Sequence, residues 1–253
     1  MRQAPKSRPL LLGHRGASKY ATENTLPAFD LALKHGCDGF EFDVRYTSDG
    51  HTLLCHDPFL NALEIAETPY VQLCRSVPPH ELAELRSSQP AGSTLSSVAM
   101  ASRAPQLACL EDVIQIYGNS AFLDIELKVE GDMAQWLPFL KSHPPQKGYV
   151  ISSFVPEVLM AVHHADPSIP LGLIVGSREG EQLGVWHELP VSALILNSRL
   201  VVRSLVEELH RAGKQVYVWT VNDQKEMLEF AALEVDGIIS DDTKLLSATF
   251  AGD

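Results

Sequence analysis

Residues 9–36 read PLLLGHRGASKYATENTLPAFDLALKHG, and this stretch contains the unit from which the fold is built. The apolar run at 9–13 predicts a short strand, and the apolar spacing from residue 25 onward predicts a helix over 25–36. Thr25 is expected to cap the start of this helix, and Gly36 is expected to end it. The stretch is therefore interpreted as one strand followed by one helix.

The same alternation of strand and helix continues along the chain. Strands are predicted at 9–13, 38–44, 51–56, 121–127, 148–153, 170–175, 193–197, 215–221 and 236–240. Helices are predicted at 25–36, 110–118, 132–142, 156–165, 201–213 and 223–233. Alternation over this length is typical of parallel βα units, in a barrel or in a doubly wound sheet. The number of strands favours an α/β fold of the (β/α)8 TIM-barrel class.

Nine predicted strands exceed the eight of a barrel. The strands at 38–44 and 51–56 are joined by a segment that is too short for a parallel crossover and contains the turn signal Asp49-Gly50, so a hairpin is favoured for this pair. Whether one of the nine is a hairpin partner or an extra strand stays open. Residues 58–105 show weak periodicity, with one helix predicted at 79–86. We interpret them as a small excursion after the third strand, within a single domain over 1–253.

The composition limits the possible partners and compartments. A net charge of -12 argues against nucleic acid or an anionic membrane surface as the main partner. The four cysteines are scattered without a metal-binding spacing, which predicts reduced thiols in a cytoplasmic protein. No apolar run approaches the roughly 20 residues that span a bilayer, so no integral membrane segment is expected. The sequence does not indicate the oligomeric state.

Acidic residues are expected inside the barrel. Alternate residues of a strand share one face, so Glu41 and Asp43 point one way while their apolar neighbours point toward the outer helices. On another strand, Asp124, Glu126 and Lys128 also share a face. Several carboxylates in a packed interior are costly unless a cation compensates them. A divalent ion that prefers oxygen ligands, Mg²⁺ or Ca²⁺, is therefore predicted.

Polar residues that end strands indicate the chemistry. His14 and His56 each follow a strand, where a TIM barrel places its catalytic groups, and a histidine pair can serve as acid and base. Arg15 offers a fork of donors to phosphate oxygens. Glu23 and Asn24 precede the helix start, where the helix dipole favours an anion. Together these residues predict a phosphate site.

A series of motifs then resembles one known family. The segments GHRG…ENTLPAF, FEFDV, TLLCHDP, IELK, ISSF and VYVWTVN…VDGIISD, in this order from about residue 9 to residue 241, resemble the glycerophosphodiester phosphodiesterase family of TIM-barrel enzymes. The resemblance implies metal-dependent hydrolysis of a small glycerophosphodiester to glycerol 3-phosphate and an alcohol. In-line attack by water, or by the neighbouring glycerol hydroxyl through a cyclic phosphate, is implied as the mechanism.

The resemblance also implies roles for individual residues of this sequence. It implies Glu41, Asp43 and Glu126 as metal ligands, His14 and His56 as the acid–base pair, Arg15 and Lys128 on the phosphate, Glu23 and Asn24 in the loop that orients the site, and Phe154 and Trp219 at the mouth. The assignment of acid and base between the two histidines stays open, as does the choice of metal.

One departure from the family pattern leaves the leaving group open. The segment HDPFLNALEIAETPY, which starts at His56, lacks the arginine and the glycines that usually follow this motif. A lysophospholipase D-like or sphingomyelinase D-like phosphodiesterase on the same site is the nearest alternative. A non-catalytic phosphodiester-binding barrel and a doubly wound binding protein are the alternatives from other classes.

Overall fold

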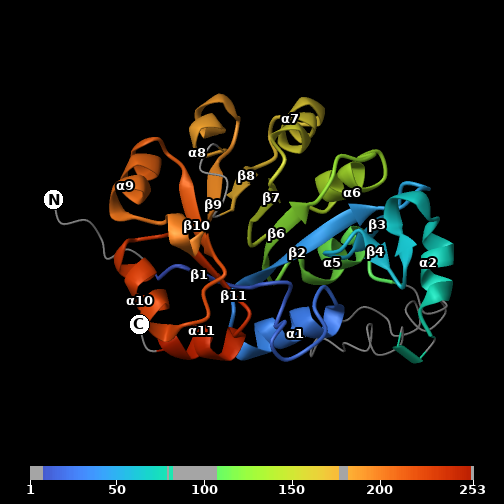
Figure 1. The fold of residues 1–253 in the computed structure, drawn as a ribbon, viewed down its shortest axis with the longest axis horizontal. Coiled ribbons are helices and arrows are strands. Elements are labelled where there is room, and N and C mark those ends of the chain that lie inside the picture. Colours follow the sequence, from blue (N-terminus) through green and yellow to red (C-terminus); the bar gives the residue numbers. More distant parts are fainter. Residues whose placement is uncertain (1–7, 79, 82–106, 177–181, 252–253) are drawn as a thin grey trace.

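A computed structural model describes residues 8–78, 80–81, 107–176 and 182–251. Its main sheet has nine strands, and the eight that remain without the antiparallel β3 form a closed parallel barrel (Figure 1). β1 closes the ring by pairing with both β2 and β11. The barrel strands are β1 (Leu10–Gly13), β2 (Gly39–Tyr46), β6 (Phe122–Leu127), β7 (Tyr149–Ser153), β8 (Leu171–Val175), β9 (Ala193–Asn197), β10 (Gln215–Trp219) and β11 (Gly237–Ser240). The predicted TIM barrel is confirmed.

Helices surround this ring, as Figure 1 shows. Those that follow barrel strands or lead into them are α1 (Leu26–His35), α5 (Leu110–Tyr117), α6 (Trp136–Ser142), α7 (Pro156–Ala165), α8 (Gln182–Val185), α9 (Arg203–Arg211), α10 (Gln224–Ala232) and α11 (Thr243–Phe250). Short 3-10 turns occupy Ile65–Glu67, Trp186–Glu188 and Ser198–Leu200. No helix in the described ranges is long and apolar enough to cross a bilayer.

The predicted outward face of β2 is confirmed by its aromatic packing. The ring of Phe40 stacks on Phe29 of α1 at 4.2 Å and meets Tyr117 of α5 edge-on at 5.2 Å. Phe42 packs against Phe29 at 5.6 Å. Because these rings hold β2 between two helices, the alternate residues of the strand must face the barrel interior. The carboxylates of β2 therefore point into the barrel.

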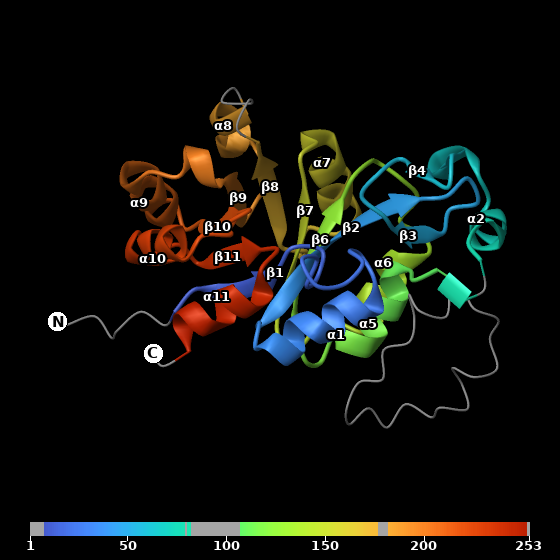
Figure 2. The ribbon, with the colours of Figure 1, turned by 60° about the horizontal axis from the view of Figure 1, so that its bottom comes forward.

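The ninth predicted strand is the hairpin partner of β2. β3 (Thr52–Leu54) pairs with β2 in antiparallel register, as the short connection and the Asp49-Gly50 turn predicted. Beyond it the chain leaves the barrel through β4 (Phe59–Leu60), β5 (Leu63–Glu64) and α2 (Tyr70–Ser76), which lie together on the side of β2 in Figures 1 and 2.

The sequence prediction missed the short elements of this excursion. β4, β5 and α2 were not predicted, because these elements are only two to seven residues long and contain few apolar residues. They nevertheless share a small apolar cluster of buried residues, namely Leu53, Ile65, Leu73, Val77 and Leu107. The helix predicted at 79–86 lies outside the described residues except for residues 80–81.

Three helices of the barrel also differ from the sequence prediction: α6 begins later than predicted, and α8 and α11 were not predicted. The helix expected at 132–142 begins only at Trp136, because the carboxylate of Asp132 accepts the backbone N–H of Ala134 and forms a turn instead. α11 was not predicted, although Asp242 caps it by accepting the backbone N–H of Leu245. All four cysteines have free thiols.

Candidate active site

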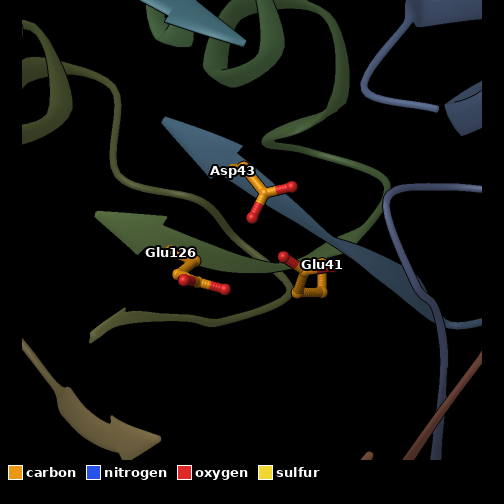
Figure 3. A group of neighbouring side chains, drawn as sticks. All are labelled: Glu41, Asp43 and Glu126. Carbon is orange, nitrogen blue, oxygen red and sulfur yellow. The ribbon is translucent and has the colours of Figure 1, made fainter. Parts of the chain in front are cut away.

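Three carboxylates meet inside the barrel at the carboxyl-terminal side of two neighbouring strands. Glu41 and Asp43 come from β2 and Glu126 comes from β6, where it is the register partner of Asp43. One oxygen of each lies within 4.8 Å of the others, and the three side chains point toward one another (Figure 3). All three residues are buried. The strands predicted to carry the metal ligands thus bring them together.

The surroundings of the Glu41 carboxyl group favour a cation as its partner. Burial raises the pKa of Glu41 well above its usual value, and the nearby charges of Asp43, Glu126 and Asp124 raise it further. Its Oε1 atom is buried and accepts no hydrogen bond from the described residues. A buried carboxylate oxygen without a donor is costly, and a hard divalent cation is the partner that carboxylate oxygens prefer. The donor set fits such an ion.

Two basic side chains border the cluster. Lys128 Nζ lies 2.6 Å from Glu126 Oε1 and 3.2 Å from Asp43 Oδ1. Arg15 Nε lies 3.2 Å from Asp43 Oδ2, and Arg15 Nη1 donates to Glu23 at 2.8 Å. Burial favours a raised pKa for Asp43, but Lys128, the amide of Asn24 and Arg15 together lower it below the usual value. Asp43 is therefore held as a carboxylate.

The loop after β1 fixes the two candidate metal ligands of β2, Glu41 and Asp43. Asn24 donates from Nδ2 to Asp43 Oδ2 at 2.8 Å and accepts the backbone N–H of Asp43 at 3.0 Å. The backbone N–H of Arg15 donates to Glu41 Oε2 at 2.9 Å. Arg15 and Asn24 both have a positive φ, a conformation that asparagine tolerates well. Asn24 was predicted in the loop that orients the phosphate site. Its side chain is hydrogen-bonded to Asp43, a candidate metal ligand.

His14 is held at the edge of the cluster by a residue to which the sequence prediction gave no role. Its Nδ1 lies 2.7 Å from Asp241 Oδ1, and its Nε2 lies 3.9 Å from Glu41 Oε2. Asp241 is itself held by Asn222, which donates to Oδ2 at 2.6 Å, and by the Ser18 hydroxyl at 3.0 Å. Burial favours a higher pKa for Asp241, but the hydrogen bonds from His14 and Asn222 lower it to about 2.

Asp241 could have been found from its position in the chain. It directly follows β11, and a polar residue at the carboxyl end of a barrel strand indicates a functional role. The family motif VDGIISD also ends on it. Its partner His14 lies 227 residues away in the sequence, so no local pattern could identify the pair.

His56 lies closer to solvent than His14. It sits in the loop between β3 and β4, its side chain is 38% exposed, and its Nδ1 lies 2.9 Å from the carboxylate of the exposed Asp57. Its neighbour Cys55 donates its backbone N–H to the carbonyl of Asp43 at 3.2 Å, so the loop that carries His56 starts beside the strand of the cluster. The two histidines are therefore held differently, His14 by a fixed carboxylate and His56 by an exposed one.

Two aromatic side chains at the ends of strands lie beside the cluster. The rings of Phe154, after β7, and Trp219, which ends β10, pack edge to face with centroids 5.6 Å apart. Lys128 Nζ lies 5.7 Å from the centroid of Phe154, and Trp219 Nε1 donates to the carbonyl of Ile195 at 3.1 Å. Both rings pack on the apolar cluster that fills the interior, which consists of Leu12, Phe122, Val150, Ile174, Ala193, Ile195, Tyr217 and Ile239.

Asp124 is a fourth buried carboxylate on the interior face. It lies two residues before Glu126 on β6 and accepts a hydrogen bond from Ser152 Oγ at 2.6 Å. Burial raises its pKa to about 7, although the Ser152 hydroxyl opposes this shift. Folded Asp124 thus keeps a proton up to about pH 7, whereas an unfolded aspartate loses it near pH 4. Its contribution to stability is present below about pH 4 and is lost as the pH rises toward 7.

We therefore expect the metal-free protein to lose stability as the pH rises from about 4 to 7. A single group of this kind changes the free energy of unfolding by at most about 1.4 kcal/mol per pH unit. Asp124→Asn should flatten this dependence, and the exposed control Asp132→Asn should leave it unchanged. Urea unfolding in EDTA at several pH values measures the slope, and an equal slope in wild type and Asp124→Asn would contradict the expectation.

Known proteins resemble this chain over most of its length. The model of the glycerophosphoryl diester phosphodiesterase family matches residues 14–245. The chain is 30% identical over 246 residues to a glycerophosphodiester phosphodiesterase of Caldanaerobacter subterraneus subsp. tengcongensis, which covers 94% of this chain and 96% of that protein.

Solved structures share the fold. A phosphodiesterase of Oleispira antarctica, in complex with the product sn-glycerol-3-phosphate, superposes with a TM-score of 0.72 at 24% identity over 96% of both chains. A glycerophosphodiester phosphodiesterase of Agrobacterium tumefaciens superposes with a TM-score of 0.72 at 21% identity over 95% of this chain and 99% of that one. The chain therefore belongs to the glycerophosphoryl diester phosphodiesterase family, and it is a glycerophosphodiester phosphodiesterase built on a TIM barrel.

Proposed function

We propose that this enzyme hydrolyses small glycerophosphodiesters to glycerol 3-phosphate and an alcohol with a divalent metal held by Glu41, Asp43 and Glu126. The observation that carries the proposal is the buried cluster of these three carboxylates, with His14 Nε2 3.9 Å from Glu41. We further propose that the whole chain acts as one catalytic domain, with residues 58–105 as an insertion.

The metal proposal rests on the oxygen donors of the cluster. Mg²⁺ or Ca²⁺ suits three carboxylates and leaves positions for water or substrate. Held by Glu41, Asp43 and Glu126, such an ion would offer positive charge to the negatively charged phosphoryl oxygens of the substrate. Arg15 and Lys128 are proposed to bind the remaining phosphate oxygens, because both cations lie beside the carboxylate cluster. The anionic oxygens of a bound diester would then become hydrogen-bond partners of both side chains.

The acid–base part of the proposal assigns proton transfers to His14 and His56. Because Asp241 engages Nδ1 of His14, only Nε2 is available for exchange with a reacting oxygen. One histidine takes the proton of the attacking hydroxyl, either water or the neighbouring hydroxyl of the glycerol, and the other gives a proton to the leaving alkoxide. Glu23 pairs with Arg15, and Asn24 keeps Asp43 in place during these steps.

The first test is metal removal and replacement. We expect EDTA treatment to stop glycerol 3-phosphate release from glycerophosphocholine and glycerophosphoethanolamine, and Mg²⁺ or Ca²⁺ to restore it. The same ions should raise the melting temperature of the EDTA-treated protein, since they bind the folded state and relieve the carboxylate cluster. Full activity after exhaustive chelation would contradict the metal proposal. Phosphorus NMR during turnover would detect a cyclic phosphate.

Exposed apolar residues near the mouth favour a second candidate substrate. Phe59, three residues after His56, is 53% exposed, and Val129 and Val155, which follow the barrel strands β6 and β7, are each 37% exposed. Such residues could contact the acyl chain of a lysophospholipid in a lysophospholipase D-like reaction. Release of choline from lysophosphatidylcholine, with little from glycerophosphocholine, would favour this candidate. Phe59→Ser should then raise KM for the lysolipid alone.

A further inference from the structure

Arg45 makes a contact that the proposed chemistry does not yet use. It lies two residues beyond Asp43 on β2, so it continues the row of alternate residues that starts with Glu41 and Asp43. Its Nε and Nη2 atoms both donate to the backbone carbonyl of His56, at 2.9 and 2.6 Å. A guanidinium that directs two donors at one carbonyl fixes that peptide group more firmly than a neutral donor can.

A second bond ties the same loop to the same strand. The backbone N–H of Cys55 donates to the carbonyl of Asp43 at 3.2 Å, directly after the antiparallel pairing of β3 with β2 ends at Leu54. The residues on either side of the peptide between Cys55 and His56 are thus fixed to β2, one by the backbone of Asp43 and the other by Arg45. The charge of Arg45 also acts on Cys55, opposing the rise in its thiol pKa that burial causes.

His56 needs such an anchor more than His14 does. The ring of His14 is held by Asp241, which is itself held by Asn222 and Ser18. Within the described residues, the ring of His56 contacts one carboxylate, that of Asp57, whose side chain is 77% exposed and whose attraction is therefore weakened by solvent. For His56, precise placement must come from the backbone.

We propose that Arg45 is a positioning residue that clamps the backbone of His56 to β2, and so sets the distance between His56 and the carboxylates of the same strand. This inference rests on the proposed role of His56 as acid or base. The competing role for an arginine at this place is direct phosphate binding. The geometry favours the clamp, because Nε and Nη2 are both already used on the carbonyl of His56.

The two roles predict different kinetics. If Arg45 positions His56, Arg45→Met lowers kcat by about 10- to 100-fold, because a misplaced proton donor or acceptor mainly slows the chemical step. KM for the diester and the inhibition constant of inorganic phosphate then stay within about threefold of wild type. Arg45→Lys keeps the charge but cannot direct two donors at one carbonyl, so it should lose nearly as much kcat as Arg45→Met.

A readout without turnover keeps this test independent of the proposed reaction. Hydrogen exchange of peptides covering residues 53–60 should be about 10- to 100-fold faster in Arg45→Met than in wild type, because a charge-assisted bond that holds the loop is lost. The matched control is Lys214→Met, which removes another cation that donates to a backbone carbonyl, that of Val191, at the opposite end of the barrel. It should leave both kcat and exchange of 53–60 unchanged.

Each outcome decides the proposal. Faster exchange of 53–60 with a lower kcat and an unchanged phosphate inhibition constant supports the clamp. A higher KM and inhibition constant with unchanged kcat and exchange would make Arg45 a phosphate ligand and overturn it. Unchanged exchange overturns the clamp whatever the kinetics. A wild-type protein without diesterase activity would refute the proposed function, and the exchange experiment would still decide the clamp.

Discussion

Glu41→Gln is expected to abolish hydrolysis and, in EDTA, to unfold at a higher temperature than wild type. The loss follows from the proposed metal site, where one of three anionic ligands becomes neutral; the expected decrease in kcat/KM is about 10³-fold or more. The gain in stability follows from the raised pKa of Glu41, because burial and the charges of Asp43 and Glu126 make its ionised form costly. Replacing the carboxylate by a neutral amide removes the repulsion between Glu41 and the other two carboxylates.

The measurement combines diesterase assays with thermal unfolding in EDTA and in metal. Added Mg²⁺ or Ca²⁺ should stabilise wild type much more than Glu41→Gln. The difference between the two melting temperatures should therefore become smaller with metal, or change sign. Glu229→Gln is the matched control, since it neutralises an exposed glutamate that pairs with Lys225 on the outer helix α10. A Glu41→Gln protein that keeps its activity, or that is less stable than wild type in EDTA, would contradict the metal site.

His14→Ala is expected to lower kcat by about 10²- to 10⁴-fold, the usual size of a general acid–base contribution. Asp241→Ala should lower it less, by about 10- to 100-fold, because His14 then remains but is free to turn. The double variant should be no slower than His14→Ala alone, since Asp241 acts through the histidine. Effects that multiply in the double variant would mean that Asp241 acts on another group.

The pH range in which the His14, Asp241 and double variants should be compared follows from the pKa of Asp241. Its folded pKa of about 2 is lower than that of an unfolded aspartate near 4, so its carboxylate stabilises the fold above about pH 4 and this contribution is lost as the pH falls toward 2. Assays between pH 6 and 8 therefore compare ionised Asp241 with its absence. Circular dichroism of each variant separates loss of the His14 contact from loss of the fold.

The fold could be predicted because the barrel strands carry strong local patterns. On β2, the alternation of phenylalanine with carboxylates indicates both the strand and its inward face, and Thr25 and Gly36 mark both ends of α1. The elements that escaped prediction are short or weakly patterned. β4 and β5 have two residues each, and α2 is stabilised by a small cluster that includes Leu53 of β3 and Leu107 from distant segments.

Some residues of the candidate site could also be predicted from local patterns, and others could not. Glu41, Asp43 and Glu126 could be predicted to meet, since adjacent parallel strands present equivalent positions to the same interior. The position of Asp241 after the last strand could single it out, but its pairing with His14 could not be predicted from sequence, and neither could the role of Arg45. Asp241 acquires its partner only when the last strand lies beside the first, and Arg45 looks like any charged residue at the end of a strand until the carbonyl of His56 is in place.

The closure of the barrel by β1 and β11 has a consequence during synthesis. His14 is synthesised before the strand beside β1 and before the carboxylate that holds its imidazole, which follow more than two hundred residues later. A nascent or truncated chain that stops before β11 has an open barrel edge on β1 and an unheld His14 at the same time. A chain truncated before β11 is therefore expected to lose diesterase activity, because both the closed edge of β1 and the contact that holds His14 depend on residues 237–241.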